Sequence, residues 1–515
     1  MNPAIPKSAR DRSFVRKVVY VAAMGLLLMP LYWLSHPATR AVDPKGERGR
    51  AGGVLARLRK DYKLTQVDIG EIDPAIETIR LAALGMRGVA TTLLWSKAER
   101  YKMKKDWTNL RAALEQISKL EPHSIGVWRF QAWNLSYNVS VAFDDYHDKY
   151  YWVMEGIKFM QRGAQYNEHE PRLVWDLGWF TSQKIGRADE AALYRKLFKE
   201  DDLYRSSLPP AMRGLGDNWL VGKAWFREAE DRVDDEHPIR GLSDVIFYSN
   251  APMAQFYYGE AVEKDGDFGG VAARAWKQAA DDWYDYGRRE IPTSWDVNIR
   301  LNDQEMHEQA ARRAAAELDK LAPGVRDKLA AEKRAKLTDA EKAACDAPPE
   351  KRTPEQARLA ADAGPRLAVS NEEIARRVTG PARREALKLA DEASHATEMA
   401  DYVRRERSKV NFDYWRLRAE VEQDPETIAA RKAIYEADQA FHRADLLTAR
   451  AAYERGFKTW RTVLDRYPTF KEDSNTGYDL MQSIRDYRKL LKQLDETFPK
   501  PFILQDIIDK NDRRE

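Results

Sequence analysis

Residues 128–141 read Trp-Arg-Phe-Gln-Ala-Trp-Asn-Leu-Ser-Tyr-Asn-Val-Ser-Val, an aromatic-rich stretch that predicts helical turns. Trp133 and Tyr137 are four residues apart, as are Asn134 and Asn138, so each pair shares one face of a helix. We expect the two aromatic side chains to fill a core and the two amides beside it to need hydrogen-bond partners. Amides in that position either join neighbouring helices or hold a ligand.

On both sides of this stretch, from about residue 71 onward, helical segments alternate with short breaks at Gly, Asn, Asp or Pro. Strand-like alternation is nearly absent, so the pattern predicts an all-α fold. A period of about 34 residues is typical of tetratricopeptide (TPR) repeats, in which small residues let two antiparallel helices approach. We therefore expect a TPR-like helical-hairpin solenoid, and a plain α-helical bundle is the alternative.

The clearest TPR-like helix pair lies near the C-terminus, where Ala437, Ala449, Tyr453 and Gly456 have the TPR spacing and Ala444-Asp445 forms the turn. Weaker copies occur earlier: Leu94, Ala98, Tyr101, Leu114 and Pro122; Trp175 to Gly178 with a turn at 184–186; and Ala272, Trp276 and Ala279 after a turn at 265–269.

In this arrangement the stretch 128–141 becomes the first helix of an expanded second unit. We then expect its aromatic side chains at the seam between units. We also expect the amides of Asn134 and Asn138 to bond helix ends or loops of the neighbouring unit.

An uncharged run from Val18 to Leu34 predicts a transmembrane helix. Basic residues precede it, which favours a cytoplasmic tail at residues 1–17 and an extracytoplasmic body. Residues 35–70 are predicted to form a flexible, charged spacer. A cleaved signal peptide is the alternative, although no clean small-x-small site follows the run. We expect a single-pass protein of the cytoplasmic membrane that contacts the lipid bilayer through residues 18–34.

A charged segment at residues 301–400 separates two repeat regions, residues 71–300 and residues 401–515. No aromatic residue stands between Trp295 and Tyr402, and Ala, Lys, Arg and Glu predominate there. This composition predicts solvated helices, which serve either as a partner-binding arm or as a spacer.

Three pairs are expected to break these helices: Pro323-Gly324, Pro348-Pro349 and Gly364-Pro365. A loop is expected around residues 345–355. Just before the charged segment, residues 291–300 predict an extended stretch or a short hairpin.

The composition excludes several classes of protein. The chain has 515 residues and is 43% hydrophobic, which is enough for a sizeable core. Its 85 basic and 82 acidic side chains leave a net charge of +3, so a nucleic-acid partner is not expected. The single cysteine, Cys345, excludes a disulfide within the chain. The eight histidines form no HExxH cluster, and there is no phosphate loop or GxSxG motif, so we expect no metal, no cofactor and no enzyme.

Further motifs accompany the stretch 128–141 along the body: Trp152-x3-Gly156-Ile157, Gly178-Trp-Phe180, Lys184-Ile-Gly186, Asp217-Asn-Trp-Leu-Val-Gly-Lys-Ala-Trp-Phe-Arg227, Phe247-Tyr-Ser-x-Ala-Pro-Met253, Ile291-Pro-Thr-Ser294 and Tyr453-Glu-Arg-Gly-Phe-x2-Trp460. Together they resemble a group of membrane-anchored, TPR-like proteins abundant in planctomycetes and related bacteria. The resemblance covers most of residues 80–300 and 400–500, and it implies the helical fold and the anchor. The function of that group is unassigned, so the resemblance supplies no catalytic residues.

Two classes of function fit these patterns. The first is a scaffold whose concave surface binds envelope proteins or peptides. The second is a carbohydrate- or small-ligand-binding module, with a groove lined by Trp128, Trp133, Asn134, Tyr137, Asn138, Asp144 and Asp145. Catalysis by the two aspartates is not expected, because neighbours in sequence seldom face one another.

Burial distinguishes these two classes. If Trp133, Asn134 and Asn138 are inaccessible in the folded protein, the ligand hypothesis fails. Exposure of the same three side chains in a wide cleft would favour it.

Overall fold

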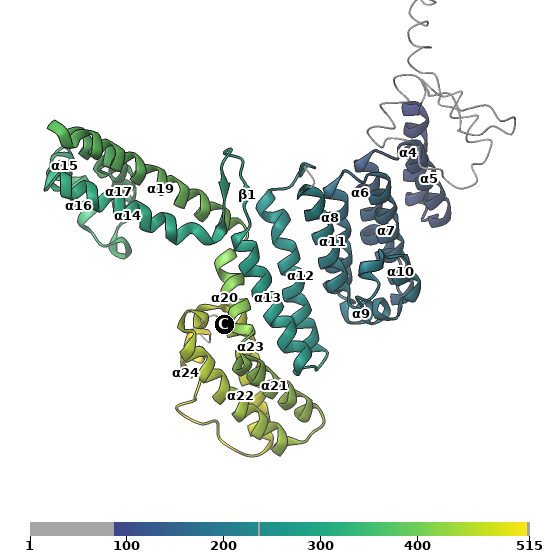
Figure 1. Ribbon diagram of the computed structural model, residues 1–515. Helices are drawn as coiled ribbons and strands as arrows, with labels where there is room; N and C mark the ends of the chain where they lie inside the picture. The colour runs from purple at the N-terminus through teal and green to yellow at the C-terminus, as the bar shows by residue number, and fades with distance from the viewer. Residues whose placement is uncertain (1–86, 235–236, 512–515) are drawn as a thin grey trace, which may run out of the picture. The chain divides into compact units, whose positions relative to one another are not determined.

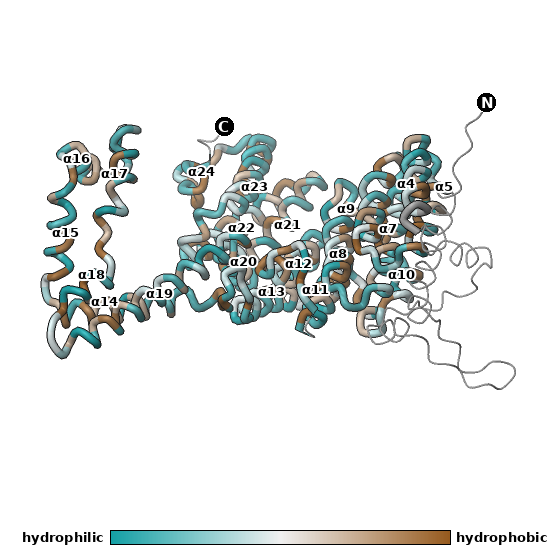
Figure 2. The backbone as a smooth tube through the Cα atoms, turned by 90° about the horizontal axis from the view of Figure 1, so that it is seen from above, coloured by the Kyte–Doolittle hydropathy of each residue, from teal (hydrophilic) through white to brown (hydrophobic). Residues whose placement is uncertain are grey.

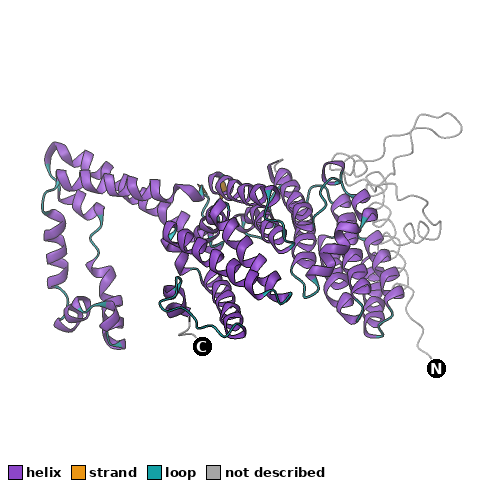
Figure 3. Cartoon of the chain, turned by 90° about the horizontal axis from the view of Figure 1, so that it is seen from below, coloured by secondary structure: helices purple, strands orange, loops and turns teal. Residues whose placement is uncertain are grey.

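The computed structural model describes residues 87–234 and 237–511. These residues form 21 α-helices and almost no strand, so the all-α prediction is confirmed (Figures 1 and 3). The predicted tail, membrane span and spacer, residues 1–17, 18–34 and 35–70, lie outside the described residues. Within the described ranges, no helix combines the length and the apolar character that a membrane crossing requires.

The chain divides into two compact units between Ala113 and Leu114. The first unit contains α4 (Arg87–Met103) and the beginning of α5 (Trp107–Leu120), so the division falls inside α5. The second unit contains the end of α5 and every later element.

The first part of the second unit is a series of helices in which each long helix contacts the next (Figure 1). The elements are α6 (Ile125–Trp133), η1 (Asn134–Val139), η2 (Ser140–Ala142), α7 (Tyr146–Tyr166), α8 (Pro171–Trp179), η3 (Phe180–Lys184), α9 (Ala191–Glu200), α10 (Asp202–Ser207), η4 (Pro210–Met212), α11 (Asn218–Asp234), α12 (Asp244–Lys264) and α13 (Gly270–Arg288). Figure 2 shows hydrophobic and hydrophilic residues alternating along these helices, as expected for helices that bury one face.

Small residues set the distance between α8–η3 and α11. A methyl group at Gly222 of α11 would lie 2.7 Å from the Cβ of Ser182, and one at Gly178 would lie 2.9 Å from the ring of Phe226. Only glycine fits at such a separation, because real Cβ contacts are longer. The two backbones therefore pack almost directly against each other.

A two-stranded antiparallel hairpin follows α13, as residues 291–300 predicted. Strand β1 (Ile291–Pro292) pairs with β2 (Asn298–Ile299), with Ile291 opposite Ile299. Trp295, in the turn of the hairpin, stacks on Tyr402 with ring centroids 4.9 Å apart. The two aromatic residues on either side of the charged segment thus contact each other.

The charged segment forms η5 (Leu301–Asp303), α14 (Gln304–Leu321), α15 (Val325–Ala335), α16 (Asp339–Asp346), η6 (Pro349–Lys351), α17 (Pro354–Leu367), α18 (Asn371–Arg377), η7 (Gly380–Ala382) and α19 (Arg383–Lys409), which runs through the predicted boundary at residue 400. The segment has a small apolar core of its own: Leu318, Ala322, Leu329, Ile374, Ala375, Val378, Ala386 and Ala390.

Two of the three predicted helix breaks in this segment are confirmed. Pro323-Gly324 separates α14 from α15, and Pro348-Pro349 separates α16 from α17. The break at Gly364-Pro365 was wrong, because α17 continues through Pro365 to Leu367. A proline there removes a single hydrogen bond in the last turn, which the helix tolerates.

The C-terminal region contains α20 (Phe412–Glu422), α21 (Pro425–His442), α22 (Leu446–Arg466), η8 (Pro468–Glu472), α23 (Ser474–Gln493) and α24 (Gln505–Asn511). The expected helix pair at residues 437–456 is present as α21 and α22. Ala444 has a φ of 61° in the turn between them, and the carboxylate of Asp445 caps α22 by accepting from the Thr448 amide. Ala437, Ala449 and Tyr453 are buried between the two helices.

Candidate functional site

A groove of about 530 Å³ lies between α6 and α8, and we call it the aromatic groove. It is lined by Gly126, Arg129, Phe130, Trp133, Met160, Arg172, Trp175, Asp176, Trp179 and Phe180. Five of the ten lining side chains are aromatic, and three carry a charge. Both walls therefore combine apolar surface with ion pairs.

Each wall of the groove changes its helical geometry at a tryptophan. Trp133 is the last residue of α6 before the π-helical turn η1, and Trp179 is the last residue of α8 before the π-helical turn η3. A π-helical turn inserts an extra residue and so redirects the side chains around it, and such turns are frequent at functional sites. In both walls, a π-helical turn thus begins directly after a tryptophan that lines the groove.

Three of the five aromatic side chains that line the groove are exposed, and the other two are buried. Phe130 is 46% exposed, Trp133 45% and Trp179 38%, whereas Trp128, on the opposite side of α6, is 2% exposed. Single exposed apolar residues are common, but three that share one groove make it a candidate interaction surface.

Two arginines bind the same carboxylate, that of Asp176, at the edge of the groove. Arg172 Nε lies 3.0 Å from Asp176 Oδ1, and the guanidinium of Arg129 contacts Oδ2 of the same aspartate. Burial raises the pKa of Asp176, and the two arginines only partly offset this effect. Burial also lowers the pKa of Arg172, whose guanidinium lies 4.6 Å from the ring of Trp175. With two cations and one anion, the cluster has one positive charge in excess.

Trp133 does not fill a core, so that expectation was wrong. Instead, its ring stacks on Tyr137 at 6.2 Å on the exposed side, and Tyr137 is half-buried with the Lys184 ammonium 4.6 Å from its ring. Burial raises the pKa of Tyr137. Trp128 is the core residue of this stretch, and its indole Nε1 donates to the carbonyl oxygen of Pro122 at 2.8 Å.

The two asparagines bond each other rather than a neighbouring unit. Asn138 Nδ2 donates to Asn134 Oδ1 at 2.9 Å, and Asn134 is 2% exposed. Their four-residue spacing places both amides on one side of the same helical turn, and this local partner is the nearest. The expectation that the amides of Asn134 and Asn138 would bond helix ends or loops of the neighbouring unit was therefore wrong.

Asp144 and Asp145 are exposed and do not line the groove. Asp145 caps the N-terminus of α7, where its carboxylate accepts from the amides of His147 and Asp148. These bonds lower the pKa of Asp145. Its role in the fold is that of a helix cap.

Sequence reasoning found only Trp133 among the residues that line the groove. It missed the second wall, although a signal was present. A Val-Trp pair followed by a second tryptophan occurs in both helices, Val127-Trp128 before Trp133 and Val174-Trp175 before Trp179, with a spacing of five residues in α6 and four in α8. This recurrence points to α8 as a second aromatic helix, but only packing shows that the two helices form one groove.

The comparisons with known proteins add no relative to these observations: no family model matches the chain, and no curated protein matches it in sequence.

Proposed function

We propose that this protein is a membrane-anchored, TPR-like scaffold that binds partner proteins at the cell envelope. The observation that carries the proposal is the aromatic groove, where Phe130, Trp133 and Trp179 are each more than one-third exposed. Aromatic residues are enriched at protein interfaces because they bury a large area at a small cost in conformational entropy. In this proposal a segment of the partner covers these three rings.

The TPR-like part of the proposal is supported by two helix pairs. In α12 and α13, a methyl group at Gly259 would lie 2.9 Å from the ring of Trp276, and in α21 and α22, one at Gly456 would lie 2.8 Å from Ile434. Small residues opposite bulky ones are what the repeat needs at these positions. Stacked helix pairs of this kind present long surfaces to extended ligands.

The anchor rests on the apolar run at residues 18–34, and the basic residues before it favour a body outside the cytoplasm. The partners would then be envelope proteins or peptides exposed at the same membrane face.

The chemistry of the groove suggests what the partner segment carries. A bulky apolar side chain in the groove would contact Trp133 and Trp179, which both line it. An acidic side chain next to it would offset the excess positive charge of Arg129, Arg172 and Asp176. A volume of about 530 Å³ is within the usual range for a few side chains. We therefore propose an apolar residue close to a carboxylate as the recognised feature.

A carbohydrate ligand remains the second candidate, because exposed indole rings stack on sugars. However, hydroxyl recognition needs free amides or carboxylates in the groove. Asn134 is buried and already accepts from Asn138, while Asp176 is engaged by two arginines. A peptide therefore fits the groove better than a sugar.

The full-length chain in detergent micelles can be screened against a peptide library in which bulky apolar and acidic positions vary independently. The proposal predicts enrichment of peptides that combine both features, and loss of that enrichment in Trp133→Ala and in Arg129→Glu. Tyr284→Ala is the matched control, since Tyr284 is 54% exposed on α13 and outside the groove. Equal enrichment in all variants would contradict the proposal, and binding to a glycan array instead would favour the second candidate.

A further inference from the structure

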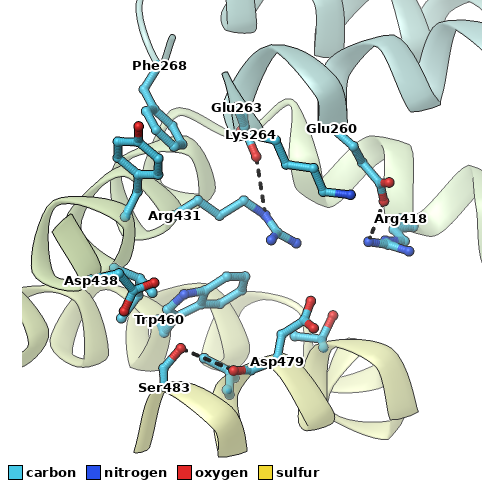
Figure 4. A pocket seen from close by; sticks show the side chains of 14 residues that line it. Glu260, Glu263, Lys264, Phe268, Arg418, Arg431, Asp438, Trp460, Asp479 and Ser483 are labelled. Carbon is cyan, nitrogen blue, oxygen red and sulfur yellow. Dashed lines mark hydrogen bonds and ion pairs between the residues drawn. The ribbon is translucent and has the colours of Figure 1, made fainter. Parts of the chain in front are cut away.

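A second cavity, of about 310 Å³, lies between the C-terminal end of α12 and the helices α20, α21, α22 and α23 (Figure 4). We call it the charged pocket. Its walls come from segments that are more than 150 residues apart in the chain, since Arg418 of α20 contacts Glu260 of α12 at 3.0 Å. The pocket is therefore a product of tertiary packing.

Carboxylates outnumber cationic side chains among the residues that line the charged pocket, counted together with the buried Glu422 that pairs with Arg431. The carboxylates are Glu260, Glu263, Glu422, Asp438 and Asp479, and the cations are Lys264, Arg418 and Arg431. Glu422, which is fully buried, uses both oxygens on Arg431, at 2.6 Å to Nε and 2.5 Å to Nη2. Much of the charge of Arg431 is thus already compensated, and the remaining carboxylates lack an equal number of cations.

Glu263 shows this deficit most clearly. The side chain is 9% exposed, and its Oε1 accepts a hydrogen bond from Trp276 Nε1 at 2.8 Å. Its Oε2 faces the pocket and lies 3.8 Å from Arg431 Nε, which is beyond hydrogen-bond distance (Figure 4). Burial raises the pKa of Glu263 to about 7; Arg431 opposes this effect, while Glu422 and Glu260 add to it. Oε2 thus has an ion pair with Arg431 but no hydrogen bond, so it can accept one from a ligand in the pocket.

Aromatic rings form the other part of the wall. Phe268 packs on Tyr435 with centroids 5.3 Å apart, and the face of Trp460 borders the pocket 5.4 Å from the guanidinium of Arg431. Cations bind over such faces, most strongly over tryptophan. Asp438 lines the pocket as well and accepts from the hydroxyl of Tyr453 at 2.6 Å. Burial raises the pKa of Asp438.

We propose that the charged pocket binds an organic cation, an ammonium or guanidinium group, through Glu263, Asp438 and Asp479 beside Trp460 and Tyr435. The incoming group would supply the donor that Glu263 Oε2 lacks and would offset the excess of carboxylates. Its source is either a Lys or Arg side chain of a partner protein or a free amine. This site is separate from the aromatic groove and does not depend on the function proposed for it.

Isothermal titration calorimetry on the full-length chain in detergent micelles tests the proposal with three probes. These are the capped peptide Gly-Arg-Gly, the neutral capped peptide Gly-Gln-Gly and the free guanidino amine agmatine. The arginine peptide or agmatine should bind at one site, about tenfold or more tightly than the glutamine peptide. Tighter binding of agmatine identifies a free amine as the source, and tighter binding of the arginine peptide identifies a protein side chain.

Two substitutions locate the binding. Asp479→Asn and Glu263→Gln should each weaken the cationic probes about tenfold. Asp391→Asn, in an exposed carboxylate of α19 away from the pocket, should leave them unchanged. Asp479 lies on an exposed position of α23, so its variant keeps the test valid if Glu263→Gln does not fold.

Affinity should also depend on pH. Because the proton on Glu263 must leave before it can pair with a cation, binding should tighten as the pH rises from 5 to 8, and Glu263→Gln should flatten this change. The proposal would be overturned if neither the arginine peptide nor agmatine bound more tightly than the glutamine peptide. It would also be overturned by binding that Asp479→Asn leaves unaltered.

Discussion

Trp133 and Trp179 each end an α-helix at the residue where a π-helical turn begins, and both line the aromatic groove. Both helical segments pack closely on their neighbours at a glycine, since a methyl group would clash with Ser136 at Gly156 and with Ser182 at Gly222. Rigid helices therefore hold exposed rings at fixed positions. A surface of this kind needs little reorganisation before a partner binds.

Trp133 and Trp128 should contribute differently to the free energy of unfolding. Trp128→Ala should lower the free energy of unfolding by about 3–5 kcal/mol, because it empties a core position that is 2% exposed. Trp133→Ala should change it by less than about 1 kcal/mol, since the ring is 45% exposed. Urea denaturation followed by circular dichroism measures both. Similar losses in the two variants would show that Trp133 has a structural role.

The close packing of η3 on α11 predicts that Gly222→Ala destabilises the fold. The added methyl group would lie 2.7 Å from Ser182 Cβ, and relieving that clash should cost about 1–3 kcal/mol. Gly364→Ala is the matched control, because Gly364 lies within α17 with no atom within 4 Å of the added methyl group. The control should be neutral or slightly stabilising, as alanine favours helices. Thermal denaturation that ranks the two variants the other way would contradict this packing.

The hydrogen bond between Asn138 and Asn134 should contribute modestly to the free energy of unfolding. Asn138→Ala removes the donor to the buried Asn134 Oδ1, which should cost about 1 kcal/mol of stability. Because neither amide lines the groove, peptide binding should be unchanged. Calorimetric melting and a binding titration on the same preparation measure the two effects. Weakened binding with an unaltered melting temperature would show that Asn138 contacts the ligand.

Stability should fall with rising pH because of Glu263. Its pKa is raised to about 7 in the folded protein from 4.5, so the folded state holds its proton more tightly than the unfolded state. The folded protein therefore loses stability as the pH rises from about 4.5 to 7, by up to about 3 kcal/mol. Glu263→Gln should remove this part of the pH dependence, which urea midpoints at pH 5 and pH 8 would measure. Parallel pH profiles for the two proteins would show that Glu263 is ionised throughout.

The sequence predicted those features that depend on neighbouring residues. The all-α fold, the hairpin at residues 291–299 and the turn at Ala444-Asp445 follow from local periodicity and turn chemistry, and all three are present. The TPR spacing around Tyr453 also corresponds to a real helix pair, although the repeat assignment itself stays a proposal.

The sequence could not predict features that arise from geometry or long-range packing. The four-residue spacing correctly placed Trp133 and Tyr137 on one face, where their rings stack, but it could not show that Trp133 lies on the surface rather than in the core. The contact between Arg129 and Asp176 joins residues of two different helices, and no local sequence pattern predicts it. Likewise, the alanine-rich core of the charged segment contains no aromatic residue, so its composition resembled that of fully solvated helices.

Photo-crosslinking in living cells can show whether the aromatic groove binds a partner segment. p-Benzoylphenylalanine replaces Phe130 in the groove or, as a control, Tyr284, which is similarly exposed outside it. Crosslinked products are then mapped by mass spectrometry on the full-length chain, with and without Arg129→Glu. We expect a protein adduct at position 130 whose crosslinked peptide carries a bulky apolar residue next to an acidic one. We also expect a reduced yield with Arg129→Glu and no such adduct at position 284. The same adducts at both positions, or adducts at position 130 that are unaffected by Arg129→Glu and lack an acidic residue, would contradict partner binding in the groove.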